Sequence, residues 1–437
     1  MARERPRSDA GVRKKKPREK NANGFFKVLG PGLITGAADD DPSGIATYSQ
    51  VGARFGFGLL WTLLFSFPMM FTVQEIAARI GRITGKGLAA NMTAHYPGRV
   101  TFPLVALLVA ANIFNLGADI AAMGSALQLI VGGPALLFGV LFAILSLGLQ
   151  VFVPYSAYSR YLKWLTLVLL AYVATVLAVH VPWGEALRHT FLPSFPWSRE
   201  GLEVIAAVLG TTISPYLFFW QASTEVEDVR RRPTEKPLKK APHQAGTQFR
   251  RIRLDTLIGM AASNLVAFFI MLTAAVTLHA HGKTDIGSAA EAAEALRPVA
   301  GPFAFTLFSM GIIGTGLLAL PVLAGSAAYA VGEAFHWPTG LQQKPWQAKR
   351  FYAVIAAAMI LSVGIVFSGL DPIKALVLSA AINGVVSAPI LILLMVMSGN
   401  RRLMGEFRIS RPMTILGWIT TGFMGAVAVA LFASFLW

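Results

Sequence analysis

The segment Asp39–Gly44 places three consecutive carboxylates and a proline, in the order Asp-Asp-Asp-Pro-Ser-Gly, inside an apolar stretch. An Asp at the centre of a membrane helix costs roughly 2.5 to 3.5 kcal/mol even on a lenient insertion scale. Because no Lys or Arg falls in the predicted interior of any span, a bound cation is the natural compensation. Successive helical residues point about 100° apart, so at most two carboxylates face one site. Asp41, next to the proline, has the best geometry, and Asp39 and Asp40 are candidates for a watery vestibule.

A second break interrupts the sixth apolar span, where Thr211–Tyr216 reads Thr-Thr-Ile-Ser-Pro-Tyr. A proline inside a helix removes a backbone donor and frees a carbonyl. In hydrocarbon, those freed groups must be satisfied by protein, water or a bound ion. Ordinary proline kinks are the alternative, but they leave the three carboxylates of the first break unexplained. Two interrupted helices, five spans apart, therefore predict a transporter built from inverted five-helix repeats.

The rest of the chain must hold these two breaks at membrane depth. Of its 437 residues, 55% are hydrophobic and only 14% are charged, whereas a soluble domain averages about a quarter charged residues. Apolar stretches of roughly 20 residues, the length that crosses a bilayer, recur along the chain. We predict an all-α polytopic membrane protein with eleven spans, at about residues 28–50, 56–80, 101–131, 134–153, 159–180, 200–224, 253–279, 302–335, 350–369, 372–397 and 411–436.

Positive charge is distributed very unevenly between the two sides of these spans. With a cytoplasmic N-terminus, 32 of the 38 Lys and Arg residues fall on the cytoplasmic side, as the positive-inside rule requires. The net charge of +16 is therefore a topology signal and gives no reason to expect nucleic-acid binding. We expect an inner (plasma) membrane protein with its C-terminus outside and the lipid bilayer as its surroundings. The absence of cysteine excludes disulfides and thiolate metal sites, and protein partners are left open.

The chain has no room for a separate soluble domain. The predicted organisation is a disordered basic tail, a first repeat that extends to the start of the second, a cytoplasmic linker, the remainder of the second repeat, and a final helix. Their boundaries are 1–24, 25–224, 225–252, 253–397 and 398–437.

At both breaks the sequence resembles the Nramp family of divalent-metal transporters. That family carries Asp-Pro-Gly-Asn at the first break and Met-Pro-His at the second, where this chain has Asp41–Gly44 and Ser214–Tyr216. Segments Asn112–Asp119 and Ala375–Ser379 also look like parts of the family pattern, so the resemblance covers about residues 25–400. It implies the LeuT-type fold with eleven transmembrane helices, which matches the count from hydropathy.

The resemblance implies a metal site, and the departures from the pattern bear on the metal. Family members coordinate manganese or iron through the Asp, the Asn, the Met sulfur and two carbonyls, which by position here belong to Ala38 and Thr211. Asp41 is kept, while Gly44 replaces the Asn and Ser214 replaces the Met. Loss of the soft thioether favours hard ions, and we expect the missing Asn side chain to enlarge the cavity. Such a site suits partly hydrated Mg²⁺, with Mn²⁺ second, as in the Nramp-related magnesium-transporter branch.

Proton coupling is also expected to differ. The family's His at the second break is Tyr216 here, and a phenol is a poor proton carrier at neutral pH. Asp119 keeps a relay open, but uncoupled uptake driven by the gradient and membrane potential is the favoured reading. Gln221 and Asn383 are further candidates to contact the ion or its water shell, with ordinary helix packing as the alternative.

Other functions compete with this one. Within transporters these are a proton-coupled Mn²⁺/Fe²⁺ carrier and an amino-acid carrier, although three carboxylates would repel a substrate carboxylate. A divalent-cation channel is the alternative of a different class. An enzyme is not expected, because no nucleophile–base pair or phosphate loop is visible, and no cofactor is predicted.

Overall fold

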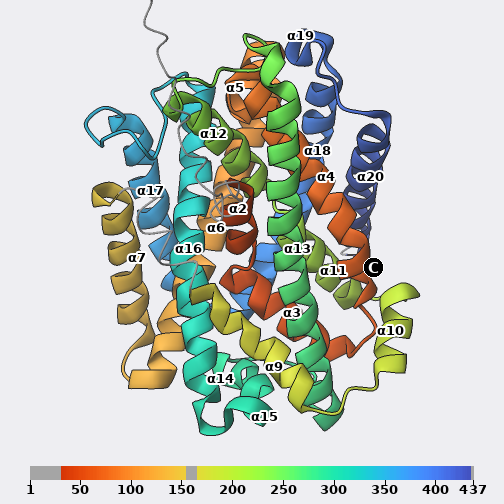
Figure 1. Ribbon diagram of the computed structural model, residues 1–437. Coiled ribbons are helices and arrows are strands. Elements are labelled where there is room, and N and C mark those ends of the chain that lie inside the picture. Colours follow the sequence, from red (N-terminus) through yellow and green to blue (C-terminus); the bar gives the residue numbers. More distant parts are fainter. Residues whose placement is uncertain (1–30, 154–164, 435–437) are drawn as a thin grey trace, which may run out of the picture.

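The computed structural model describes residues 31–153 and 165–434, which form a bundle of helices without any strand (Figure 1). The predicted disordered tail, and the start of the fifth predicted span, lie outside these residues. The longer helices are α2 (Pro31–Asp39), α3 (Pro42–Phe55), α4 (Trp61–Thr84), α5 (Leu88–His95), α6 (Gly98–Val131), α7 (Ala135–Phe152), α9 (Leu170–Ala178), α10 (Trp183–Phe191), α11 (Arg199–Thr212), α12 (Pro215–Arg231), α13 (Ala245–Thr277), α16 (Ala304–Ala334), α17 (Lys349–Val366), α18 (Pro372–Gly399) and α20 (Arg411–Ser434).

Short helices lie in the connections at the two ends of the bundle, except for one 3-10 turn that runs directly into α9. They are α14 (Ala289–Ala293), α15 (Arg297–Ala300), α19 (Arg401–Met404) and the 3-10 turns η1 (Leu165–Leu169), η2 (Pro242–Gln244), η3 (His279–His281), η4 (Glu294–Leu296) and η5 (Gly301–Phe303). In Figure 1, α5 and α19 mark one end of the bundle, and α10, α14 and α15 mark the other.

The helices agree with the predicted spans. Within the described ranges, nine helices are long and apolar enough to cross a membrane, and the pair α11–α12 counts as one of them. The split pair α2–α3 and the shorter apolar helix Leu167–Ala178 complete the pattern. The prediction of an all-α bundle with two interrupted helices is therefore confirmed.

Both interruptions follow from local sequence chemistry. Pro42 and Pro215 stand at the first position of α3 and α12, where a residue without a backbone N–H is tolerated. Before Pro42 the chain is extended, with Asp41 at φ −70° and ψ 170°. Its carboxylate caps α3 by accepting a 2.7 Å hydrogen bond from the backbone N–H of Gly44. The first break is thus a helix end and a capped helix start, joined by two residues.

Close backbone contacts hold the half-helices in the middle of the bundle, where Figure 1 shows α2 and α3. A Cβ on Gly36 of α2 would lie 2.3 Å from the carbonyl oxygen of Gly259 in α13. A Cβ on Gly210 of α11 would lie 1.9 Å from the carbonyl oxygen of Ala380 in α18. Only glycine permits such approaches, which are typical of helix packing in membranes.

The connection between α12 and α13 is shorter than the predicted linker 225–252, because α12 continues to Arg231 and α13 begins at Ala245. Its first part, residues 232–241, is here called the strap. The strap follows the end of α4, where the backbone N–H groups of Leu238 and Lys239 donate to the carbonyls of Arg82 and Ile83 at 3.2 and 3.3 Å. The strap thus joins α12 to α4 and is not a detached linker.

Candidate metal site between two broken helices

Asp41 is the centre of the candidate site, and its two carboxylate oxygens have different partners. Oδ1 is held by the Gly44 N–H at 2.7 Å. Oδ2 accepts longer hydrogen bonds, from Asn115 Nδ2 at 3.2 Å and from the Tyr216 hydroxyl at 3.4 Å. The side chain is 2% exposed, so the site is closed to solvent. Since long contacts are weak, Oδ2 is the oxygen that is available to bind a cation.

The second break brings further oxygen atoms to Asp41. The Tyr216 hydroxyl also lies 3.5 Å from the carbonyl oxygen of Ala38, the last turn of α2. The Ser214 hydroxyl lies 2.8 Å from the carbonyl oxygens of both Gly210 and Thr211. Helix C-terminal carbonyls and hydroxyls of this kind are cation ligands in transporters with broken helices. Tyr216 therefore contacts both Ala38 and Asp41 of the first break. Ser214 and Thr211 supply the oxygen atoms of the second break.

Gly44 does not enlarge the cavity as the sequence led us to expect. A Cβ at this position would lie 3.1 Å from the Thr211 hydroxyl oxygen and 3.4 Å from the carbonyl oxygen of Asp39. The space next to Gly44 is therefore filled by the Thr211 side chain and by backbone. The physical reason is that the two breaks pack against each other, so a neighbour occupies the volume that a side chain would take.

Asp39 and Asp40 face α13 and not a water-filled vestibule. The hydroxyl of Ser263 lies 2.6 Å from Asp39 Oδ2 and 3.0 Å from Asp40 Oδ1, and both carboxylates are buried. Within the described parts of the chain, no three His, Asp or Glu side chains gather closely enough to hold a metal ion. The candidate site therefore depends on one carboxylate together with hydroxyl and carbonyl oxygens.

Two predicted residues, Gln221 and Asn383, make no hydrogen bond to Asp41. Gln221 lies in the second turn of α12 and donates from Nε2 to the Thr256 hydroxyl of α13 at 2.8 Å. Asn383 lies in α18, with its amide oxygen buried and without a hydrogen-bond partner among the described residues. Gln221 thus contributes a polar contact between α12 and α13, and the amide oxygens of both Gln221 and Asn383 are buried without a hydrogen-bond partner among the described residues.

Sequence reasoning missed the side chains that hold Asp41 from the opposite side. Asn115 of α6 donates to Asp41 Oδ2, and its own Oδ1 accepts from the Ser379 hydroxyl of α18 at 2.8 Å. Both residues fall inside segments that resemble the family pattern, so their polarity within an apolar helix was the available signal. Asp119 lies one turn beyond Asn115 on α6 and is fully buried.

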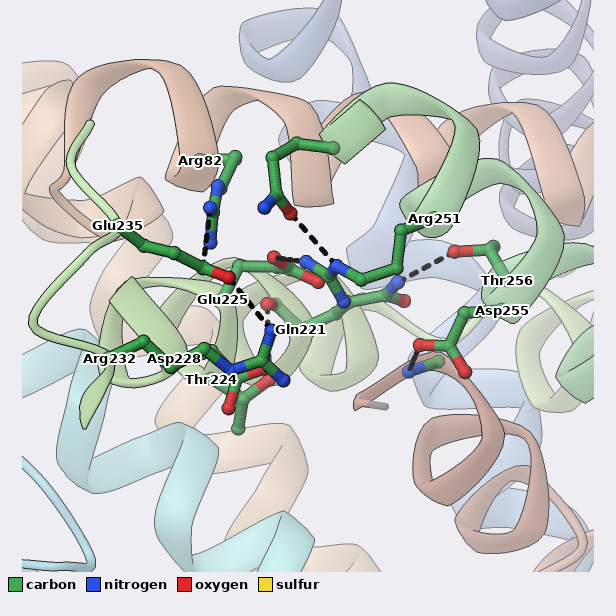
Figure 2. Close-up of polar contacts among 12 residues, drawn as sticks. Arg82, Gln221, Thr224, Glu225, Asp228, Arg232, Glu235, Arg251, Asp255 and Thr256 are labelled. Carbon is green, nitrogen blue, oxygen red and sulfur yellow. Dashed lines mark hydrogen bonds and ion pairs between the residues drawn. The ribbon is translucent and has the colours of Figure 1, made fainter. Parts of the chain in front are cut away.

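A layer of ion pairs closes the bundle end that charge predicts to be cytoplasmic (Figure 2). Arg82 of α4 is fully buried and pairs with Glu235 of the strap at 2.6 Å. Arg232 pairs with Glu235 at 2.9 Å and reaches Asp228 at 3.6 Å. These contacts fasten α4, α12 and the strap to one another.

The same layer continues to α13. The buried carboxylate of Glu225 in α12 pairs with Arg251, so this helix end is packed and not solvated. Near it, Asp255 accepts a 2.7 Å hydrogen bond from the backbone N–H of Gly32 at the start of α2. A carboxylate suits this helix N-terminus because free N–H groups and the helix dipole favour negative charge. On this side of the bundle, α2, α4, α12 and α13 are therefore joined by charged groups.

The strap carboxylate shows the electrostatic effect of this layer. Burial alone would raise the pKa of Glu235, but hydrogen bonds from Arg232 and Arg82, with the charges of both guanidinium groups, hold that pKa below its ordinary value.

At the other end of the bundle, Gln50 of α3 donates to Asp285 at 2.9 Å and accepts from the backbone N–H of Ile286 at 2.9 Å. Polar contacts thus close both ends around Asp41.

Comparison with known proteins agrees with this architecture. The family model described as "Natural resistance-associated macrophage protein-like" matches residues 32–434. The divalent metal cation transporter MntH of Yersinia pestis (strain Pestoides F) is 30% identical over 406 residues, which cover 90% of this chain and 91% of that protein. The protein of the same name from Klebsiella pneumoniae (strain 342) is 28% identical and covers 90% of each chain.

Solved structures show the same fold at low sequence identity. The Eremococcus coleocola manganese transporter, in complex with an aromatic bis-isothiourea substituted compound, superposes with a TM-score of 0.71 at 16% identity, over 95% of this chain and 89% of that one. MhsT in complex with L-phenylalanine gives a TM-score of 0.61 at 12% identity, over 96% and 100% of the two chains. The predicted LeuT-type fold is confirmed. The chain belongs to the Nramp family and is a multi-pass membrane transporter of divalent metal cations, not an enzyme.

Proposed function

We propose that the chain mediates uptake of Mg²⁺, and secondarily Mn²⁺, by alternating access and without coupled proton movement. The observation that carries this proposal is the donor set around the two breaks. Asp41 contributes a carboxylate, Ala38 and Thr211 contribute carbonyls, and Ser214 and Tyr216 contribute hydroxyls. All of these are hard oxygen donors, which suit Mg²⁺ and Mn²⁺ better than softer transition metals.

A single carboxylate fits Mg²⁺ in particular. This ion gives up its water reluctantly and is usually held by one or two carboxylates while it keeps several waters. Asp39 and Asp40 both face the Ser263 hydroxyl of α13, whereas Asp41 is the carboxylate that Tyr216 of the second break contacts. Hydroxyl and carbonyl oxygens can then bind the ion's waters. The filled space next to Gly44 limits the room on that side and leaves the side of Oδ2 for the hydrated ion.

Uptake without protons follows from the group that replaces the family's imidazole. Tyr216 contacts Asp41 through a phenol hydroxyl, and a phenol does not exchange its charge near neutral pH as an imidazole does. The driving force is then the ion gradient with the inside-negative potential. For a divalent ion that potential supplies about 4.6 kcal/mol per 100 mV.

Alternating access requires that the two ends open in turn. Asp41 is buried, and the ion-pair layer of Arg82, Glu225, Glu235 and Arg251 closes one end. Movement of α2 and α12 away from α4 and α13 would separate these pairs. Such a rearrangement of discrete contacts between packed helices is a common form of transport gating.

Uptake into proteoliposomes tests the proposal. We expect saturable Mg²⁺ entry at a carrier rate, Mn²⁺ competition, and no acidification of the lumen while either ion enters. Proton influx driven by Mn²⁺ would overturn the uncoupled mechanism. Flux that fails to saturate would indicate a channel.

A second candidate is proton-coupled transport of Mn²⁺ or Fe²⁺, and one contact favours it. The Met123 sulfur of α6 and the Pro42 ring lie on the same side of Gly316, because a Cβ on this glycine would lie 2.4 and 3.3 Å from them. A thioether therefore lies close to the first break, and buried Asp119 stands one turn away on α6. Substitution Met123→Leu separates the candidates, since it should abolish a Mn²⁺ preference under this reading and leave Mg²⁺ uptake unchanged under the first.

A further inference from the structure

We propose that Asn115, oriented by Ser379, is a positioning residue that fixes the rotation of the Asp41 carboxylate so that Oδ2 alone is presented to a cation, and thereby favours Mg²⁺ over the larger Ca²⁺. This inference rests on the proposed function, because it takes Asp41 as the ion-binding carboxylate. It adds a determinant of ion selectivity that lies outside both breaks. Asn115 lies in α6 and Ser379 in α18, two uninterrupted helices on the far side of Asp41.

The orientation of the Asn115 amide follows from its two neighbours. If its oxygen faced Asp41, two acceptors would meet without a proton, so the amide nitrogen must face Asp41 Oδ2, as it does at 3.2 Å. The amide oxygen then faces Ser379, whose hydroxyl lies 2.8 Å away and also 2.7 Å from the Leu376 carbonyl. A hydroxyl has only one proton to donate. Donation to the Asn115 oxygen is what fixes the amide.

Asp41 is consequently held at both oxygens by different parts of the fold. Oδ1 is committed to the Gly44 N–H at 2.7 Å, the shortest of its hydrogen bonds. Oδ2 is directed by Asn115, with the Tyr216 hydroxyl at 3.4 Å as a weaker contact. Rotation of the carboxylate would break the bond to Gly44 or the bond to Asn115. A cation can therefore approach Oδ2 alone and be bound by one oxygen.

Single-oxygen binding separates the two ions by their coordination chemistry. Mg²⁺ demands octahedral geometry at about 2.0–2.1 Å and accepts one carboxylate oxygen together with water. Ca²⁺ takes 6–8 oxygens at about 2.3–2.6 Å and often gains from a bidentate carboxylate. A carboxylate that cannot present both oxygens withholds this gain from Ca²⁺. The positioning bond thus acts on selectivity as well as on affinity.

The helix that carries Ser379 is itself firmly placed. Its next residue, Ala380, has the carbonyl oxygen that a Cβ on Gly210 would approach to 1.9 Å. The α18 backbone therefore touches α11 directly beside Ser379. Since α11 leads into the second break, the orienting hydroxyl and the carbonyls of that break are held in one rigid arrangement.

Asn112 provides a matched control for Asn115. It lies on the same helix, is equally buried, and donates to the Leu323 carbonyl and the Ser326 hydroxyl of α16 at 3.0 and 2.7 Å. Both Asn115→Ala and Asn112→Ala remove a buried amide, but only the first frees Asp41. Titration calorimetry of the purified transporter with MgCl₂ and with CaCl₂ measures both affinities.

We expect Asn115→Ala to weaken Mg²⁺ binding about 10- to 100-fold, the usual effect of losing a group that supports a metal ligand. Ca²⁺ binding should fall less, so the preference for Mg²⁺ shrinks. Asn112→Ala should leave the ratio of the two affinities unchanged. Equal losses for both ions in Asn115→Ala, or the same ratio change in Asn112→Ala, would overturn the proposal.

Ser379 supplies a second test should Asn115→Ala fail to fold. Ser379→Ala removes the hydroxyl that fixes the amide, whereas Ser379→Thr keeps it. We expect the alanine variant to lose part of the Mg²⁺ preference and the threonine variant to retain it, and identical behaviour of the two would refute the positioning role. Failure of the proposed function is recognised separately, because the unmodified chain would then bind no Mg²⁺ or would bind it equally well after Asp41→Asn.

Discussion

Asp41→Asn is the sharpest perturbation of the candidate site, because it separates two roles of one side chain. Asp41 caps α3 through Oδ1 and presents Oδ2 to the site. An asparagine keeps an oxygen that can accept from the Gly44 N–H, so the cap is preserved. The charge is lost, and the amide nitrogen in place of Oδ2 can no longer accept from Asn115. Asp41→Ala removes the cap and the charge together.

The expected sizes of the two effects differ. Loss of a capping side chain to alanine costs about 1 kcal/mol, within a range of about 0.5–2. Removal of one partner from a buried charge pair costs roughly 3–5 kcal/mol, which for ion binding corresponds to about 10²- to 10³-fold or more in affinity. We therefore expect Asp41→Asn to lose Mg²⁺ binding while it keeps the contribution of the cap to the thermal stability of the ion-free protein. Asp41→Ala should lose both, with the stability loss near the size of a cap.

Calorimetry with MgCl₂, thermal unfolding without added ion, and uptake into proteoliposomes measure these quantities on the same preparations. The reasoning fails if Asp41→Asn binds Mg²⁺ within a factor of about three of the unmodified protein, because the carboxylate would then be no ligand. It also fails if both variants are equally destabilised without ion, since the cap would then contribute nothing.

Three further outcomes are expected. Gly44→Ala should weaken ion binding and cost about 1–3 kcal/mol of stability, as overpacking does, because its Cβ would lie 3.1 Å from the Thr211 hydroxyl. Thermal unfolding of Gly44→Ala with and without Thr211→Ala checks whether the second change restores the stability. Arg82→Met should open the closed ion-pair layer. Because the chain has no cysteine, a single Thr224→Cys substitution can report this opening, and its maleimide labelling should become severalfold faster. Unchanged labelling would show that Arg82 does not hold the layer closed. Since the pKa of Glu235 is lowered, its ion pair stabilises the closed layer above the ordinary glutamate pKa of about 4.3 and is lost as pH falls through the lower folded value. The difference in thermal unfolding temperature between the unmodified chain and Glu235→Gln should persist from neutral pH to about pH 4.3 and shrink only below it.

The parts of the site that could be predicted from sequence are those fixed by local chemistry. A proline within an apolar span marks a helix break whatever surrounds it, so Pro42 and Pro215 located both interruptions. Asp41 followed from its place directly before the break. The helix count followed from apolar stretches long enough to cross a bilayer. None of these inferences needs to know which helices are neighbours.

The missed features all depend on contacts between distant segments. Asn115 meets Asp41 across 74 residues and Ser379 across 264, and helical periodicity gives the face of a residue but not its partner. The sequence suggests free space next to Gly44 because glycine has no side chain. In the structure, Thr211 of the other break fills that space. Glu225 near the end of α12 pairs with Arg251 of α13, a contact between helices that the sequence alone does not show.

One carboxylate can bind a divalent ion here because the two helix breaks supply the other polar groups. The helices α2 and α11 end at the breaks, so carbonyls such as those of Ala38 and Thr211 lack helical partners and can face a cation. The helices α3 and α12 begin there, and their N-terminal dipoles stabilise negative charge on Asp41 without a basic side chain. The same geometry therefore favours negative charge on Asp41 and offers oxygen ligands to a cation. Net charge then cannot distinguish divalent ions from one another, so discrimination must come from donor type and from the directions in which Asp41 is held.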